Sequence, residues 1–190
     1  MKETSRTIQS QNTKNKIYQT SIKLFKEHGY DNVTIQDIAT SANVSVGSFY
    51  NHFQSKENIL HEKYFLADEV FKEFIATEIP GKNHKERIKL YMLRYIDFVL
   101  THPLDFIKIL YNTDNMLFLK EGRPMQTLLN PLIEDAKEEG EITSHLNVDE
   151  INEFLFLSMR GLIFHWCLHN GTFDLYDRAD TYLSIIIKSL

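Results

Sequence analysis

Residues 46–52 carry small and hydrogen-bonding side chains of the types that contact nucleic acids. Ser45 precedes them and can cap a helix, while Val44 and Phe49 are the apolar side chains that would anchor this helix in a core. The side chains left facing outward are Val46, Gly47, Ser48, Tyr50, Asn51 and His52. Such groups suit hydrogen bonds and close contacts with base edges and phosphates in a major groove.

A second short helix is predicted directly before this one, over residues 35–41. Thr34 can cap it, Ile38 and Ala42 would face inward, and the small side chain of the intervening alanine would allow a second helix to cross closely. Asn43 stands where the chain must turn, and asparagine tolerates a left-handed backbone better than most residues. Two short helices joined by a tight turn are typical of a helix-turn-helix.

The flanking segments favour the same interpretation. Lys14 and Lys16 begin an amphipathic helix that Gly29 would end. Ser55 can cap a further long helix, and Lys56 together with the free N–H groups of its first turn would form an anion site suited to a backbone phosphate. One face of the amphipathic helix is formed by Ile17, Ser21, Leu24, Phe25 and His28.

From Lys16 to Leu60 the sequence resembles the N-terminal domain of TetR-family transcriptional regulators. The matching elements are HGY at 28–30, Thr34 at the start of the second helix, VSVGSFYNHF at 44–53 and SKENIL at 55–60. Asn43 departs from the family's usual glycine, but asparagine can adopt the same turn. Beyond the first third of the chain the resemblance is one of helical layout.

This resemblance implies roles in DNA binding for individual residues. The expected phosphate contacts are Thr34, Tyr50, His52 and Lys56. The candidates for base or groove contact are Ser45, Val46, Gly47, Ser48 and Asn51. Other roles remain open, because Tyr50 and His52 could instead seal the interface between the third and fourth helices. Thr34 could serve only as a helix cap, and Lys56 could be a solvated lysine.

The formal net charge of −5 is unevenly distributed along the 190 residues. Residues 1–60 hold seven Lys and Arg against five Asp and Glu, a net charge of +2, whereas the remainder carries −7. A local basic footprint on an acidic body is consistent with DNA binding at one end of the chain. Such a small positive excess predicts weak nonspecific binding and reliance on dimeric, sequence-specific contacts.

Other chemistries find little support in the sequence. The single cysteine, Cys167, allows no intrachain disulfide and lies in an apolar stretch typical of a core residue. His165 and His169 have a spacing used by metal sites, but Cys167 between them would point elsewhere on a helix. There is no glycine-rich phosphate loop, paired-carboxylate signature or hydrolase elbow. We therefore expect neither an enzyme nor a bound metal or cofactor.

The sequence also gives an expectation for the cellular compartment. Residues 1–12 lack the apolar core of a signal peptide, and no segment approaches the ~20 uninterrupted apolar residues needed to cross a bilayer. We therefore expect a soluble, cytoplasmic protein without membrane contact.

The whole chain is predicted to be all-α, with about nine helices. Residues 1–55 would form a three-helix DNA-binding head with the helix-turn-helix, and residues 56–190 a helical ligand-binding and dimerisation domain. After the fourth helix, glycine and proline positions divide the chain into five more. These are expected at about 83–101, from 103 onward, between Pro124 and Gly140, at 148–170 and at 175–189.

The last two predicted helices are apolar on more than one side, so that each must be covered on more than one side. Gly161 in mid-helix would cost about 1 kcal/mol relative to alanine, and a close helix crossing would explain it. A two-fold four-helix bundle in a homodimer satisfies both features, although the two helices could also be central in a monomer. The expected dimer interface contains Ile151, Leu155, Met159, Gly161, Leu162, Trp166, Tyr182 and Ile186.

Aromatic and aliphatic side chains on the fifth to eighth helices could enclose an apolar pocket with a few polar groups. The family resemblance implies such a pocket, whereas stripes of this kind are also typical of an ordinary core. The expected lining residues are Tyr91, Tyr95, Phe98, Phe106, Leu110, Asn115 and Phe154.

Together these features predict a ligand-responsive, DNA-binding transcriptional regulator. We expect a homodimeric repressor that binds double-stranded DNA at a palindromic operator and is released by a small apolar or aromatic effector. In this mechanism the effector shifts the fifth to seventh helices, which move the fourth helix and change the spacing of the two heads. The alternative is a dimeric ligand-binding or adaptor protein whose degenerate head does not bind DNA.

Overall fold

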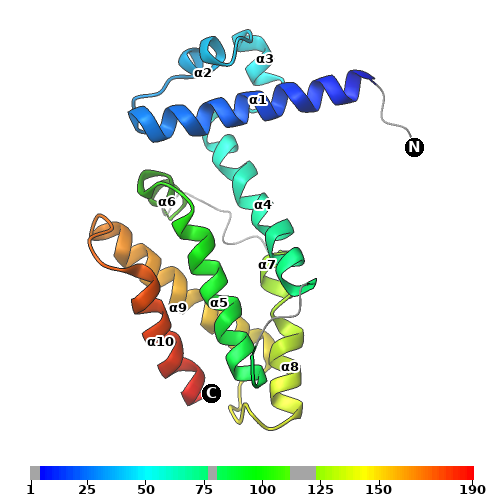
Figure 1. Cartoon of the computed structure of the whole chain (residues 1–190), viewed down its shortest axis with the longest axis vertical. Coiled ribbons are helices and arrows are strands. Elements are labelled where there is room, and N and C mark those ends of the chain that lie inside the picture. Colours follow the sequence, from blue (N-terminus) through cyan, green and yellow to red (C-terminus); the bar gives the residue numbers. More distant parts are fainter. Residues whose placement is uncertain (1–4, 77–80, 112–122) are drawn as a thin grey trace. The chain divides into compact units, whose positions relative to one another are not determined.

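The computed structural model describes residues 5–76, 81–111 and 123–190, and every regular element in these ranges is a helix (Figure 1). The all-α prediction is therefore confirmed. The chain forms two compact units, Met1–Tyr64 and Phe65–Leu190. The division falls inside a helix, nine residues after the boundary that the sequence suggested between residues 55 and 56.

The first unit contains α1 (Ser5–His28), α2 (Ile35–Ser41), α3 (Val46–Tyr50) and the beginning of α4 (Lys56–Ala76). Its core is built from large apolar side chains of all four helices, including Ile17, Phe25, Ile38, Phe49 and Ile59. Burying these side chains stabilises the unit by roughly 1.5–3 kcal/mol for each large residue. α1 ends where Gly29 adopts a positive φ of 81°, as the sequence predicted.

α1 is longer than predicted, because it begins at Ser5 and not near Lys14. The described side chains between residues 7 and 12 are all exposed, so this first part of the helix has no apolar face. Local hydrogen bonds accompany it instead, including one from the Thr13 hydroxyl to the carbonyl of Gln9. A helix without an apolar stripe leaves no periodic signal in the sequence.

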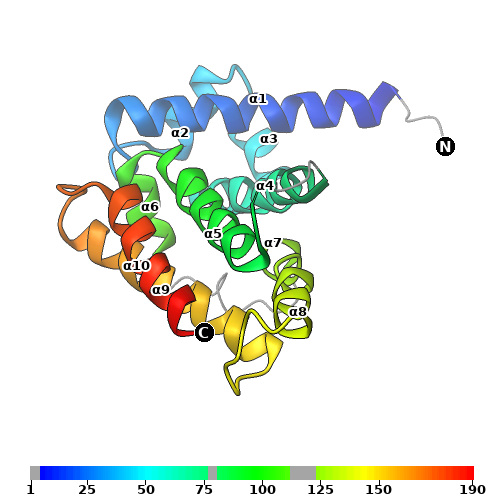
Figure 2. The same ribbon diagram turned by 60° about the horizontal axis from the view of Figure 1, so that its bottom comes forward.

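The second unit is organised around α5 (His84–Leu100), which packs against α8 (Asn130–Glu138), α9 (Val148–Leu168) and α10 (Leu175–Ser189) (Figures 1 and 2). α6 (Leu104–Leu110) contacts α9. Apolar side chains cover most of the circumference of α5, and those of Ile88, Tyr91, Met92, Tyr95 and Ile96 are fully buried. A helix surrounded in this way forms the centre of a domain.

One predicted helix is in fact two. Between Pro124 and Gly140 the structure contains α7 (Pro124–Thr127) and α8, so the described residues hold ten helices and not nine. Pro131 lies in the first turn of α8, where its missing N–H group costs nothing. In the interior of one continuous helix the same proline would remove a hydrogen bond and clash with the preceding turn.

The α9–α10 turn forms where the sequence predicted it, with positive φ values at Asn170 and Gly171. A Cβ atom on Gly171 would lie 3.2 Å from the Trp166 side chain, so glycine also suits the tight packing there. The Trp166 indole N–H donates to the carbonyl of Phe173 at 3.0 Å and closes the corner. Within the described part of the chain, no helix is long and apolar enough to cross a membrane.

Candidate nucleic-acid interface

The N-terminus of α2 is fixed by a reciprocal cap between Thr34 and Asp37. The Thr34 hydroxyl accepts the amide N–H of Asp37 at 3.1 Å, and the Thr34 amide donates to the Asp37 carboxylate at 2.9 Å. Hydrogen bonds from the Thr34 side chain and backbone lower the pKa of Asp37 below its ordinary value. The predicted helix-capping role of Thr34 is confirmed.

The turn between α2 and α3 has the geometry that the sequence predicted. Asn43 adopts a φ of 51°, in the left-handed region, and the amide of Val44 donates back to the carbonyl of Ala39 at 3.0 Å. Ala39 and Ala42 are buried and small, which allows α2 and α3 to cross closely. Val44 is only half-buried, contrary to expectation, because it lies in the turn before the helix and not on its inner face.

α3 presents one side to the core and another to solvent. The Ser45 hydroxyl caps it by accepting the amide of Ser48 at 3.0 Å, and Phe49 is fully buried. Of the predicted contacts in this segment, Ser45, Gly47, Asn51 and 52% of Tyr50 are exposed, whereas Val46, Ser48 and His52 are half-buried. α3 ends at Tyr50, so Asn51 and His52 belong to the turn that follows it.

Lys56 opens α4, as predicted, but its ammonium group has partners inside the protein. Nζ donates to the main-chain carbonyl oxygens of Tyr30 and Val33. Ser55 precedes it and contacts the first turn of α4 through its hydroxyl, which accepts the amide of Asn58 at 3.4 Å. The predicted N-terminal cap of α4 is therefore present.

Two family models match this chain, one at each end. A model of the bacterial regulatory proteins of the TetR family matches residues 17–62, which contain α2, α3 and their supporting segments. The C-terminal region of YsiA-like proteins, a TetR C-terminal model, matches residues 120–189. The chain belongs to the TetR family of transcriptional regulators. It is a DNA-binding transcriptional regulator.

Among the relatives of this TetR-family regulator, two are similar along most of its length and a third is similar over a shorter part. The probable acrEF/envCD operon repressor of Escherichia coli K12 is 24% identical over 93% of the chain and 86% of the relative. The fatty acid metabolism regulator protein of Bacillus subtilis is 21% identical over 92% of the chain and 93% of the relative. The IcaR negative regulator of the icaADBC biofilm operon from Staphylococcus aureus is 47% identical, over 37% of the chain and 38% of the relative.

Solved structures share the fold of this TetR-family regulator. FadR of Thermus thermophilus, in complex with lauroyl-CoA, has a TM-score of 0.69 at 18% identity and covers 92% of this chain and 93% of its own. FadR of Bacillus subtilis, in complex with stearoyl-CoA, has a TM-score of 0.64 at 18% identity and covers 93% of this chain and 98% of its own.

The predicted pocket residues fall into several environments. Tyr91 and Tyr95 are fully buried and hydrogen-bonded, Tyr91 through its hydroxyl to the carbonyl of Met125 at 2.6 Å and Tyr95 to the Tyr111 hydroxyl. Burial also raises the pKa of Tyr91 far above its usual value. Among the others, Phe106 and Leu110 are buried, Phe98 is half-buried, and Asn115 lies outside the described residues.

Phe154 was wrongly placed in the pocket. Its side chain is 43% exposed on the outer side of α9, while Phe156 is the residue that packs against Tyr95, with ring centroids 5.4 Å apart. Phenylalanines two positions apart face different sides of a helix.

Most of the residues of α9 that the sequence assigned to a dimer interface are instead buried within the chain itself. The stripe that the sequence assigned to a partner is buried within the chain's own core: Ile151, Leu155, Met159, Leu162 and Trp166. The large apolar residues that α9 exposes are Phe154, Leu157, Phe164 and Leu168. Gly161 lies on this exposed side and Tyr182 of α10 is 45% exposed, whereas Ile186 is half-buried.

The structure also brings together buried polar residues that the sequence analysis missed. Asp68 of α4 pairs with Arg123, and both side chains are almost fully buried. His102 lies between the rings of Phe98 and Phe106, with centroids 4.8 and 4.9 Å away. Asp68 and Arg123 are 55 positions apart, so no local pattern could have paired them.

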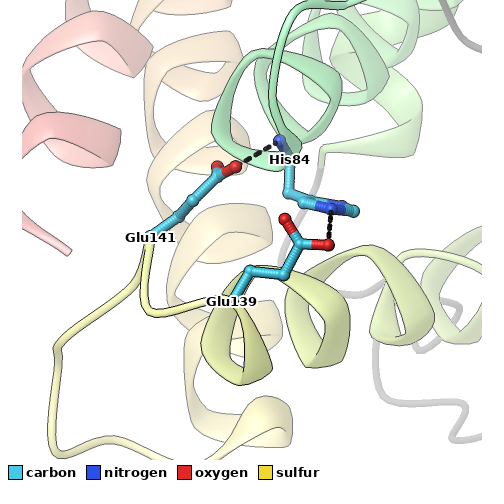
Figure 3. Close-up of side chains that lie close together, drawn as sticks. All are labelled: His84, Glu139 and Glu141. Carbon is cyan, nitrogen blue, oxygen red and sulfur yellow. Dashed lines mark hydrogen bonds and ion pairs between the residues drawn. The ribbon is translucent and has the colours of Figure 1, made fainter.

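One described group, His84, Glu139 and Glu141, has side-chain atoms close enough to share a metal ion (Figure 3). Glu139 approaches the His84 imidazole, with Oε1 3.3 Å from Nε2. Both Glu141 oxygens accept main-chain amides at the start of α5, those of His84 at 3.2 Å and Lys85 at 2.9 Å. The partial positive charge of this helix end favours the carboxylate and opposes a cation. We therefore interpret the group as a helix cap beside a contact between a carboxylate and an imidazole.

In residues 165–169, HWCLH, the two histidine rings pack against each other and against a neighbouring aromatic ring. His165 and His169 are exposed and their rings lie 4.4 Å apart, with Phe173 beside both. Cys167 is buried on another side of α9, as predicted, and burial raises the pKa of its thiol to about 11. Such a thiol is protonated at neutral pH and a poor redox sensor.

Proposed function

We propose that this regulator is a homodimeric repressor that binds a palindromic operator through α3 and is released by a long-chain acyl thioester of coenzyme A. The observation that carries the DNA-binding part is the exposed outer side of the helix-turn-helix, with Tyr50 half-exposed beside a fully buried Phe49. A short capped helix on a packed support suits insertion into a major groove.

Apart from Lys56, whose ammonium group has partners inside the protein, the proposed DNA contacts remain those of the sequence analysis. The exposed candidates are Thr34, Ser45, Gly47, Tyr50 and Asn51. The proposed groove contacts are Ser45, Val46, Gly47, Ser48 and Asn51, and the proposed phosphate contacts are Thr34, Tyr50 and His52. Their hydrogen-bonding groups provide both positioning and base recognition.

A second copy of the chain is the proposed partner for the exposed apolar side of α9 and α10. Leu157 and Leu168 of α9 and Ile185 of α10 are each more than half exposed, and Phe154 and Phe164 extend the same apolar surface. Clusters of large exposed apolar residues are costly on a monomer and typical of an interface. The partner surface is therefore the opposite side of α9 from the stripe that the sequence suggested, and it leaves the buried stripe in place.

The effector class rests on the relatives. Two TetR regulators with this fold were solved with lauroyl-CoA and stearoyl-CoA, and a relative similar along nearly the whole chain is a fatty acid metabolism regulator. An acyl chain is also compatible with the predominantly apolar interior around α5. An effector releases the repressor only if it binds the DNA-bound and free conformations with different affinities.

The test has two stages. Purified protein selects fragments from the genome of its source, and enrichment of one short palindrome supports the operator proposal. The selected operator is then titrated with acyl-CoAs of increasing chain length, with free coenzyme A and free fatty acids as controls. Release by long-chain acyl-CoA alone supports the effector class, whereas release by none of them contradicts it. Absence of any enriched sequence from a confirmed dimer contradicts the operator.

A further inference from the structure

The first turn of α4 holds the connection between α1 and α2 through one lysine. The Lys56 ammonium donates hydrogen bonds to the carbonyl oxygens of Tyr30 at 2.9 Å and Val33 at 2.8 Å. It also lies 4.3 Å from the centroid of the Tyr30 ring, within the range of a cation–π interaction. Three interactions thus converge on a single cation.

The two carbonyl groups lie near opposite ends of the connection. Tyr30 follows the glycine that ends α1, and Val33 directly precedes Thr34, the N-cap of α2. Both residues are buried, so their backbone is fixed in the core of the unit. The Lys56 side chain thus contacts the main chain directly before the N-cap of α2.

A second bond strengthens the same corner. The Tyr30 hydroxyl donates to the Glu57 carboxylate at 2.9 Å. Burial and this hydrogen bond raise the pKa of Tyr30 well above its usual range. Hydrogen bonds from Ser55 and Tyr30 are among the causes that lower the pKa of Glu57, so the carboxylate stays charged at neutral pH. Two consecutive residues of α4, Lys56 and Glu57, therefore both contact the Tyr30 side chain.

We infer that Lys56 serves DNA recognition as a positioning residue, and that its charge is used on these carbonyl groups and not on a DNA phosphate. An ammonium group has three N–H donors, and two already have main-chain partners. By fixing the start of α2 it fixes the support on which α3 is presented. This inference rests on the proposed DNA-binding function, and it replaces the phosphate contact that the sequence suggested for Lys56.

The salt dependence of operator binding separates the two roles. In a homodimer the substitution changes both copies, so loss of a phosphate contact in each would reduce the slope of log K against log salt concentration by about 1.8, whereas loss of a positioning group leaves the slope unchanged. For Lys56→Met we expect operator affinity to fall about tenfold with the wild-type slope, and the ratio of operator to nonspecific affinity to fall as well. A reduced slope with an unchanged ratio would overturn the inference.

Lys26→Met is the matched control, since it removes one positive charge from an exposed position near the end of α1. We expect it to leave the ratio of operator to nonspecific affinity at the wild-type value. If Lys56→Met does not fold, Lys56→Arg takes its place, because it retains the positive charge but cannot reproduce the hydrogen bonds of the ammonium group to the carbonyl oxygens of Tyr30 and Val33. A lower operator affinity with unchanged slope supports positioning in that variant, and unchanged affinity contradicts it.

Amide hydrogen exchange in the free protein gives a readout that needs no DNA. We expect the amides of Val33 and Ile38 to exchange faster in Lys56→Met than in Lys26→Met; the Ile38 amide is the first intrahelical one of α2. Equal exchange rates in the two variants contradict the inference. Failure of the wild-type protein to select any operator would refute the proposed DNA-binding function. The exchange experiment uses no DNA, so it tests the structural role of Lys56 separately from that function.

Discussion

Asp68 and Arg123 form a buried ion pair, with Oδ1 of the carboxylate 3.3 Å from Nη2 of the guanidinium. The same carboxylate oxygen accepts the amide of Met125 at 3.1 Å, and the carbonyl of Met125 accepts the Tyr91 hydroxyl. Side chains of α4 and α5 thus hold both main-chain groups of one residue in α7. These bonds therefore join α7 to α4, the helix in which the division between the two units falls.

Arg123→Met should destabilise the second unit by about 3–5 kcal/mol, because it leaves a nearly buried carboxylate without its counter-charge. Chemical denaturation monitored by circular dichroism measures this loss. The double variant D68L/R123M should be less destabilised than the sum of the two single variants. Additive losses would show that the two side chains contribute independently.

Leu157→Glu combined with Phe164→Glu should convert the proposed dimer into a monomer. Both side chains are exposed within one chain, so the introduced carboxylates should leave the fold of the single chain unchanged. They would destabilise only an interface with a second copy. Sedimentation equilibrium measures the change. Leu100→Glu is the matched control, since it places the same charge at an exposed leucine on α5. An unchanged dimer in the double variant would place the interface elsewhere.

Gly161→Ala should have opposite effects on the chain and on the dimer. Within one chain nothing lies within 4 Å of the position of the added Cβ, so alanine should stabilise α9 by up to about 1 kcal/mol. If a partner helix crosses closely at this glycine, dimer dissociation should become easier. Thermal melting at high and at very low protein concentration separates the two effects. Stabilisation at both concentrations would argue against a close crossing at Gly161.

Glu141→Gln should reduce stability by about 1 kcal/mol at neutral pH, because an NH2 group replaces one of the two oxygens that accept from the amides of His84 and Lys85. Burial alone would raise the pKa of Glu141, but the hydrogen bonds from those amides bring it below the ordinary 4.5. The stabilisation is therefore complete above about pH 4.5 and is lost as pH falls through the lower folded-state pKa. Unfolding curves from pH 7 to pH 3 measure it, with Glu138→Gln on the exposed side of α8 as control. Parallel pH profiles of the two variants would refute the capping role.

Tyr50→Ala should weaken operator binding at least about tenfold without changing the unfolding temperature, because the side chain is half-exposed and would lose a charge-assisted hydrogen bond to phosphate. Fluorescence anisotropy with a labelled operator measures the affinity. Tyr50→Phe retains the edge contact with Phe49 and tests the hydroxyl separately. Wild-type affinity in the alanine variant would remove Tyr50 from the interface.

The helix-turn-helix could be predicted almost residue by residue because its determinants are local. The cap of Thr34, the left-handed Asn43 and the anchor Phe49 each act within a few positions of the chain. The inner and outer sides of α9 could not be distinguished in this way. Its apolar residues cover most of the helix, so periodicity shows that more than one side must be covered but not which side faces the chain's own core.

The sequence by itself determined the all-α class, the helix caps and the turns, because short-range hydrogen bonds and backbone preferences specify them, and its resemblance to TetR regulators indicated the family. Only the tertiary structure decided which stripe of α9 is buried, which residue Asp68 meets and what the Lys56 ammonium binds. These outcomes depend on contacts between segments separated by tens of residues. Such contacts are selected by the packing of whole helices, which no local pattern records.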